Sequence, residues 1–205
     1  MNPAILHLYL VTDAPERCRL GLLDTVAAAV AGGVTLVQYR AVHPRKRACY
    51  EEARALRELL NARGVPLIIN DHIDLALAVD AAGAHVGQRD LPPEAARRLL
   101  GPGRLLGLSV NNAVQLAAAD FSLLDYIGIG PVFATQTKAD ASPVVGVERL
   151  AALVQQSPVP VVGIGGISQG NAALVRTAGV AGVAVVSAIC GAEDPAAAAG
   201  RLLIS

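Results

Sequence analysis

The chain has few aromatic residues and no net charge, and each shortage narrows the class of protein. Phe, Trp and Tyr make up 3% of the 205 residues, with no Trp, so a core would be built from Ala, Val, Leu and Ile. Lysine and arginine together number 17, as do aspartate and glutamate. A formal net charge of zero argues against a nucleic-acid or anionic-membrane partner held by bulk charge, although it leaves room for a small, locally basic anion site.

Cysteine and long apolar runs are scarce as well. The three cysteines, Cys18, Cys49 and Cys190, lie far apart and show neither metal-binding nor disulfide spacing, so free thiols in a reducing cytoplasm are the simplest interpretation. Gly, Asp or Pro interrupts every apolar run before it reaches the length of a membrane span, and no signal peptide is apparent. We therefore expect a cytoplasmic protein without a membrane or nucleic-acid partner.

The residues that are present indicate a globular, core-rich chain, because 53% are hydrophobic and only 17% are charged. Strand-like and helix-like segments alternate from end to end. We expect strands at residues 6–12, 35–39, 67–70, 84–87, 105–109, 126–130, 159–164 and 182–186. We expect helices at residues 24–32, 44–63, 73–82, 93–100, 113–119, 147–156, 171–178 and 195–203.

Eight strand–helix pairs predict an α/β fold, namely a single-domain (β/α)₈ TIM barrel over residues 1–205. Several strands are continuous apolar runs, as is typical of parallel strands buried on both faces. No Pro/Ser-rich linker divides the chain. The alternative is an open doubly wound sheet, but that fold normally has a Gly-rich first turn, and residues 11–15 (VTDAP) do not form one.

Polar side chains stand just past the ends of several apolar runs, which suggests one mouth with chemistry in it. Gln38 and Arg40 close the second predicted strand, Asn70 and Asp71 the third, and Asp90 follows the fourth. Asp71 and Asp90 follow neighbouring strands, so their carboxylates can meet above the barrel. Mg²⁺ often binds one or two carboxylates together with substrate phosphates and water. The alternative is that each aspartate caps the helix that follows it.

Two loops have the composition of a phosphate site. Residues 163–168 (GIGGIS) follow the seventh predicted strand, and residues 185–189 (VVSAI) follow the eighth. Loops at these two positions of a (β/α)₈ barrel commonly bind phosphate through bare backbone N–H groups. The alternative for the first loop is a tight turn with Ser168 as a helix N-cap.

The longest connector, residues 131–145, is long enough to act as a lid and contains Lys138. Thr135 and Thr137 flank Gln136, and in an extended loop their hydroxyls would face the same way. Arg40 could grip phosphate oxygens in a bidentate fork. The alternative for the connector is an ordinary solvated loop.

The remaining candidates give weaker signals. Ser109, at the end of the fifth predicted strand, is either a hydrogen-bond donor at the mouth or the cap of the next helix. The four histidines have no shared spacing, and His85, which alternates within a strand, is best interpreted as structural. No Ser/His/Asp order or reactive cysteine context supports nucleophilic catalysis.

Six stretches in this order carry a family resemblance: residues 32–40 (GGVTLVQYR), 68–71 (IIND), 86–92 (VGQRDLP), 128–138 (GIGPVFATQTK), 163–167 (GIGGI) and 185–189 (VVSAI). With them the chain resembles the thiamine-phosphate synthase family across nearly its whole length. The family joins hydroxymethylpyrimidine diphosphate to hydroxyethylthiazole phosphate in thiamine biosynthesis, releasing diphosphate. The resemblance therefore implies a transferase with these two small-molecule substrates.

The resemblance also implies roles for individual residues. Asp71 and Asp90 would hold Mg²⁺. Arg40, Lys138 and Ser109 would act in catalysis. The pyrimidine diphosphate would contact Gln38, Arg40, Asn70, Ser109 and Lys138, and the thiazole phosphate would contact Thr135, Thr137, Gly166, Val186 and Ser187. Tyr39 and Gln136, which lie inside the matching stretches, are counted with the substrate contacts.

The chain departs from the family pattern at two places. Val42 stands where the family has a lysine that contacts the diphosphate, and Arg45, Lys46 or Arg89 is expected to supply the missing charge. Asn111 and Asn112 stand where a histidine usually follows the fifth strand. Two other functions remain open: a thiazole tautomerase-like isomerase, which uses that histidine, and a non-catalytic phosphate-ligand sensor. The sequence also leaves open whether the protein is a monomer or a homo-oligomer.

Overall fold

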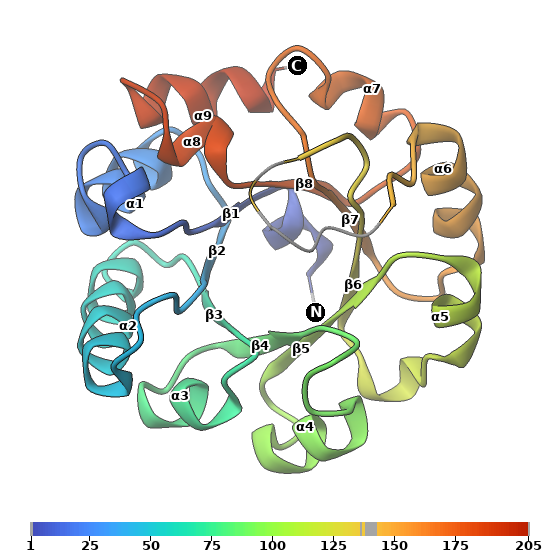
Figure 1. Cartoon of the computed structure of the whole chain (residues 1–205), viewed down its shortest axis with the longest axis horizontal. Coiled ribbons are helices and arrows are strands. Elements are labelled where there is room, and N and C mark those ends of the chain that lie inside the picture. The colour runs from blue at the N-terminus through green and yellow to red at the C-terminus, as the bar shows by residue number, and fades with distance from the viewer. Residues whose placement is uncertain (1, 136, 138–142, 205) are drawn as a thin grey trace.

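The computed structural model describes residues 2–135, 137 and 143–204 and forms one closed barrel of eight parallel strands in sequence order, with β1 hydrogen-bonded to β8 (Figure 1). The strands are β1 (Leu8–Val11), β2 (Leu36–Tyr39), β3 (Leu67–Asn70), β4 (Gly83–Val86), β5 (Leu105–Val110), β6 (Tyr126–Ile129), β7 (Val161–Ile164) and β8 (Gly182–Val185). The prediction of a (β/α)₈ barrel is confirmed.

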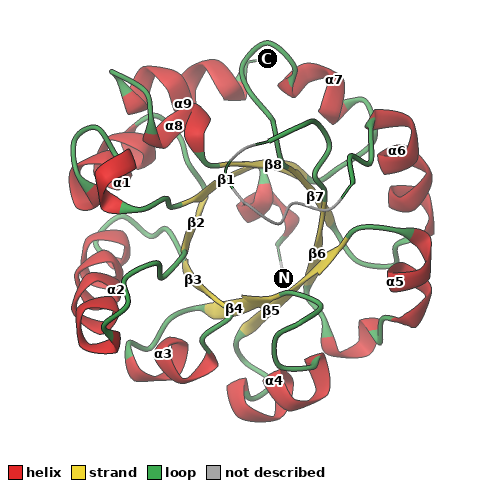
Figure 2. Ribbon diagram, in the orientation of Figure 1, coloured by secondary structure: helices red, strands yellow, loops and turns green. Residues whose placement is uncertain are grey.

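Helices form a ring outside the strands (Figure 2). They are α1 (Leu22–Ala31), α2 (Lys46–Asn61), α3 (Ile73–Ala78), α4 (Pro93–Leu100), α5 (Ala113–Ala118), α6 (Val147–Gln156), α7 (Ala172–Arg176), α8 (Ser187–Cys190) and α9 (Pro195–Leu203). Three 3₁₀ helices are η1 (Pro3–Leu6), η2 (Pro15–Arg17) and η3 (Phe121–Leu123). Each of the eight predicted helices has a counterpart, and α8 is a short additional one.

Several predicted boundaries were wrong; the largest error is in α3, which ends at Ala78 and not at residue 82. Leu6 belongs to η1 and not to the first strand, because the side chain of Asn2 accepts a hydrogen bond from Ala4 N and starts a 3₁₀ turn there. The helix predicted from Pro44 begins at Lys46. Its predicted buried face is confirmed, since Cys49, Leu56 and Leu60 of α2 are all buried.

The core has two parts because alternate strand residues point to opposite faces. An inner cluster fills the barrel and contains Tyr9, Leu36, Ile68, Tyr126 and Val162. A larger outer cluster packs between strands and helices. Both faces of each strand are therefore covered, which explains the continuous apolar runs. Cys18, Cys49 and Cys190 are buried free thiols, as expected.

The amino-terminal end of the barrel is closed by η1, which lies inside the ring of strands in Figure 1. Leu6 is fully buried in the inner cluster, and its backbone presses against Gly182 at the start of β8. The carboxyl ends of the strands thus form the mouth. None of the helices in the described part of the chain is long and apolar enough to cross a membrane.

Candidate active site

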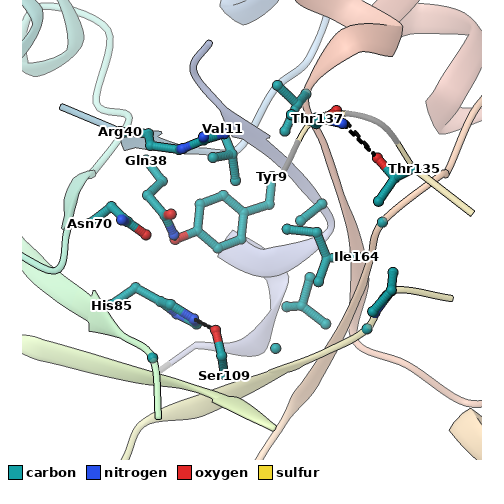
Figure 3. A pocket seen from close by; sticks show the side chains of 18 of the residues that line it. Tyr9, Val11, Gln38, Arg40, Asn70, His85, Ser109, Thr135, Thr137 and Ile164 are labelled. Carbon is teal, nitrogen blue, oxygen red and sulfur yellow. Dashed lines mark hydrogen bonds between the residues drawn. The ribbon is translucent and has the colours of Figure 1, made fainter. Parts of the chain in front are cut away.

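A cavity of about 820 Å³ opens at the carboxyl ends of the strands. Its walls come from around the whole barrel, including Val11 of β1, Gln38 of β2, Ser109 of β5 and Ile164 of β7 (Figure 3). A volume of this size suits a small organic ligand with charged groups.

The structure brings most of the predicted site residues to this one cavity. Those that line it are Gln38, Arg40, Asn70, Asp71, Asp90, Ser109, Thr135, Thr137, Gly166, Val186 and Ser187. Gln136 and Lys138, and with them the centre of the predicted lid, lie outside the described residues. The roles of these side chains toward substrate remain a prediction; what the structure shows is that they converge.

Tyr39 is the exception: it does not line the cavity, so its predicted contact with substrate is wrong. It follows the inward-facing Gln38 on β2, so it points to the outer face of the barrel. There it is 2% exposed, packs in the outer cluster and donates its hydroxyl proton to Glu52 of α2. A family match along a strand includes residues of both faces, and only one face reaches the cavity.

The two aspartates stand at neighbouring corners of the mouth. Asp71 accepts a 2.6 Å hydrogen bond from Asn70 Nδ2, and Asp90 Oδ2 accepts one of 2.8 Å from Gly87 N. Neither caps a helix: α3 has His72 as its N-cap residue and α4 has Pro92. The capping alternative is therefore wrong for both carboxylates, and both residues line the cavity.

The backbone of Asp71 is unusual, because its φ of 61° lies in the left-handed region. Its N–H donates to the carbonyl of His85, 2.8 Å away, so the residue turns out of β3 while still paired with β4. Asp and Asn tolerate this conformation better than other residues with a side chain. The turn places the carboxylate in the cavity lining rather than in the sheet.

The donor set fits Mg²⁺. Among the described residues no group of three or more His, Cys, Asp or Glu side chains could hold a metal ion. Mg²⁺ does not need one, because it commonly takes one or two carboxylates and completes its shell with water and substrate phosphate. Asp71 and Asp90, with the Asn70 amide beside them, would supply oxygen ligands of that kind.

The loop after β7 is a backbone-lined cradle. Gly165 and Gly166 have φ values of 96° and 66°. A Cβ at Gly166 would lie 2.6 Å from the carbonyl oxygen of Ala134, so the chain can pass there only without a side chain. Ser168 does not cap a helix, since Asn171 is the N-cap residue of α7. The loop therefore lies flat against the β6 loop at the edge of the cavity.

Thr135 and Thr137 stand over this cradle. Their hydroxyl oxygens are 3.3 Å apart, and Thr137 N donates to Thr135 Oγ1, 3.2 Å away, as expected of hydroxyls that face the same way. Both threonines, with Gly166 and Ser187, also line a second cavity of about 650 Å³. The side of the mouth formed by the β6, β7 and β8 loops is thus rich in hydroxyl and backbone groups.

Cations flank the carboxylate side. Arg40 and Arg89 line the cavity. Lys46 instead forms an ion pair with Asp74 of α3, and Arg45 is exposed and is not among the lining residues. Of the three basic residues predicted to replace the missing charge at Val42, only Arg89 reaches the cavity.

Sequence reasoning missed the floor of the site. Tyr9 and Tyr126 point inward, and their hydroxyl oxygens are joined by a hydrogen bond of 2.8 Å. His85 is 7% exposed and both ring nitrogens have partners, Tyr126 at 3.1 Å and Ser109 Oγ at 2.9 Å. His85 is thus satisfied, as predicted, yet it also lines the cavity. The available signal was the alternation of inward and outward side chains along each strand.

The position after β5 contains no base. Asn111 Nδ2 donates to the carbonyl of Gly130, 2.5 Å away, and Asn112 caps α5 by accepting from Gln115 N at 3.0 Å. The cap of α5 is therefore Asn112 and not Ser109, which excludes the capping alternative for the serine.

A closed (β/α)₈ barrel whose mouth gathers two carboxylates, two arginines and a glycine-rich cradle is typical of enzymes that act on small molecules. Residues 8–189 match the family model described as thiamine monophosphate synthase. The chain belongs to that family, and it is a transferase.

Individual relatives agree with this assignment. The chain is 51% identical over 201 residues to the thiamine-phosphate synthase of Azorhizobium caulinodans, covering 98% of this chain and 95% of the relative. It is 53% identical over 197 residues to that of Laribacter hongkongensis, covering 95% and 92%. The thiamine phosphate pyrophosphorylase of Pyrococcus furiosus has the same fold, with a TM-score of 0.88, 36% identity and coverage of 98% and 95%.

Proposed function

We propose that this protein joins a pyrimidinylmethyl diphosphate to a thiazole phosphate and releases diphosphate, using Mg²⁺ at Asp71 and Asp90. In the reaction the bond between the methylene carbon and the diphosphate oxygen breaks, and a bond from that carbon to the thiazole nitrogen forms. The supporting observation is that two groups of polar residues line opposite sides of one cavity. The carboxylates follow β3 and β4, and the glycine cradle follows β7, on the other side of the closed barrel.

The leaving diphosphate belongs on the carboxylate side. Arg40 and Arg89 would neutralise the charge that grows on its oxygens as the bond breaks, and Lys138 is assigned to the same task by family resemblance. Mg²⁺, when bound, would add Lewis-acid neutralisation of the same group. Gln38, Asn70 and Ser109 would orient the pyrimidine ring between the two sides.

The thiazole phosphate belongs on the opposite side. Gly166 allows the phosphate to approach the backbone, and the hydroxyls of Thr135, Thr137 and Ser187 offer donors beside it. The thiazole nitrogen then attacks the carbon that the diphosphate leaves. The nitrogen is already nucleophilic, so the coupling needs no protein base, and none is placed after β5.

The decisive experiment mixes the purified protein with both substrates and Mg²⁺ and measures thiamine phosphate by its oxidation to a fluorescent thiochrome. We expect product that depends on both substrates. Turnover of the thiazole alone would indicate an isomerase, and binding without turnover would indicate a sensor. The isomerase is disfavoured because both asparagines after β5 are engaged in structural hydrogen bonds. We place the reaction in the cytoplasm, which suits three free thiols.

Arg89→Gln is expected to raise KM for the pyrimidine diphosphate about tenfold, the effect of losing one charged contact of about 1.4 kcal/mol. The reason is that Arg89 lines the cavity and carries a positive charge, whereas Val42, at the position of the family's lysine, is uncharged. Steady-state kinetics with the thiazole phosphate saturating would measure it.

Arg45→Gln is the matched control, since the same charge is removed at an exposed position away from the cavity. Equal effects in the two variants, or an unchanged KM in Arg89→Gln, would show that Arg89 does not replace the missing cation.

A further inference from the structure

Five polar side chains form one continuous hydrogen-bonded chain across the floor of the cavity. Gln38 Nε2 donates to Tyr9 OH at 2.7 Å, and Tyr9 OH lies 2.8 Å from Tyr126 OH. Tyr126 OH lies 3.1 Å from His85 Nδ1, and His85 Nε2 lies 2.9 Å from Ser109 Oγ. The five residues come from β2, β1, β6, β4 and β5 in that order, and Figure 3 shows Gln38 and Ser109 at its two ends.

The protons in this chain can be counted. Burial raises the pKa of Tyr9 and of Tyr126, so both phenols stay protonated and each has one proton to donate. Tyr9 accepts from Gln38, and its second hydrogen-bond partner, to which its own proton can go, is Tyr126. The proton of Tyr126 then goes to His85 Nδ1. A neutral His85 therefore carries its proton on Nε2 and donates it to Ser109.

The direction in which the hydroxyl and imidazole protons point along the hydrogen-bonded chain decides which group, donor or acceptor, each end presents to a ligand. Ser109 Oγ accepts from His85, so its own proton is left to be donated into the cavity. Gln38 uses Nε2 on Tyr9, which leaves its Oε1 as an acceptor. Both residues line the cavity. Reversing the direction would require turning the Gln38 amide and every hydroxyl together, and both ends would then change their roles.

We propose that His85 is a positioning residue which, with Tyr9 and Tyr126, holds Ser109 as a donor and Gln38 as an acceptor toward the ligand. The chain thereby selects a heteroaromatic ring that offers an acceptor nitrogen to Ser109 and an amino group to Gln38. An aminopyrimidine has this pattern, and the oxo counterpart, with a carbonyl and a protonated ring nitrogen, has the opposite one. The choice of ring rests on the proposed function, but the direction of the chain does not.

The neighbouring strands leave room for this arrangement. A Cβ at Gly107 of β5 would overlap Tyr126 and His85 and lie 2.6 Å from Tyr126 OH, and a Cβ at Gly128 of β6 would lie 3.4 Å from His85 Cε1. Any side chain at Gly107 would push the two rings apart. The buried rings cannot move aside as the end of a flexible side chain can. Glycine at position 107 therefore keeps the hydrogen-bonded series of side chains unbroken.

The first test is the tautomer of His85, observed by long-range ¹H–¹⁵N NMR of the imidazole nitrogens with the ring neutral. Loss of signals in His85→Asn assigns the resonances. We expect the proton on Nε2 in the unaltered protein and a mixture of tautomers in Tyr126→Phe, which lacks the hydroxyl that donates to Nδ1. A proton on Nδ1 in the unaltered protein would overturn the proposal.

The second test is selectivity, measured as the ratio of the dissociation constants of aminopyrimidine diphosphate and its oxo counterpart with Mg²⁺. We expect the amino compound to bind about 100-fold more tightly, and the ratio to fall about tenfold in Tyr126→Phe and in Gly107→Ala. Tyr39→Phe is the matched control, because it removes a tyrosine hydroxyl bonded to Glu52 on the outer face, and it should keep the ratio. An unchanged ratio in folded Tyr126→Phe would overturn the proposal.

The two tests separate this inference from the proposed function. If the protein made no thiamine phosphate but showed the Nε2 tautomer and its dependence on Tyr126, the proposed function would fail and the direction of the chain would stand. If it made thiamine phosphate with His85 protonated on Nδ1, only the inference would fail.

Discussion

Asp90→Asn is expected to lower kcat/KM for thiamine phosphate formation by about 10²- to 10³-fold, the loss typical of removing one group that stabilises developing charge. The amide oxygen of asparagine can still accept the 2.8 Å bond from Gly87 N, so the loop after β4 keeps its shape. What is lost is the negative charge that would hold Mg²⁺ beside the diphosphate.

Asp71→Asn is expected to have a similar effect, and asparagine is the right replacement for a structural reason. Asp71 has a φ of 61°, which asparagine adopts more easily than alanine. Asp71→Ala would combine loss of charge with backbone strain. Both variants should need a higher Mg²⁺ concentration for half-maximal rate, and titrating Mg²⁺ against the initial rate measures this.

Asp74→Asn is the control for both variants. Asp74 lies on α3 close to Asp71 in sequence, but its ion pair with Lys46 is exposed and lowers the pKa of that carboxyl without reaching the cavity. It should leave the Mg²⁺ dependence unchanged. If Asp74→Asn were as harmful as Asp90→Asn, or if Asp90→Asn were fully active, the magnesium assignment would be wrong.

Gly182→Ala is expected to lower the free energy of unfolding by about 3 kcal/mol, the upper end of what overpacking a well-packed core usually costs. Its Cβ would overlap the backbone carbonyl of Leu6, and Cα of His7 would lie 2.8 Å away. Neither group can move freely, because Leu6 is fully buried and His7 O accepts a hydrogen bond from Val183 N. The clash falls where β8 closes against β1.

Gly103→Ala is the matched control. Its Cβ would meet nothing within 4 Å, and its φ lies outside the left-handed region. Equilibrium unfolding in urea, followed by far-UV circular dichroism, would measure both. Equal unfolding free energies for the two variants would mean that the amino-terminal turn does not hold the floor of the barrel closed.

Only part of the active site could be predicted from the amino-acid sequence. Asp71 could be found because it directly follows a buried strand, and Asp90 because it lies in the loop after the next strand. Parallel strands of a barrel all end at one rim. Tyr39 was misplaced because a matching stretch does not say which face of a strand a residue occupies. The neighbouring Gln38 enters the cavity, and one step along the strand reverses the direction of the side chain.

The linear order of apolar runs, turn residues and amphipathic helices determined the eight-stranded barrel, because these signals are local and repeat with the period of each element. The same order determined which polar residues stand at its mouth. Only the tertiary structure decided that Tyr9, Tyr126 and His85 join into one chain with Gln38 and Ser109. Those contacts join residues as far as 117 positions apart, and barrel closure, not local propensity, sets their distances and leaves space for them beside Gly107.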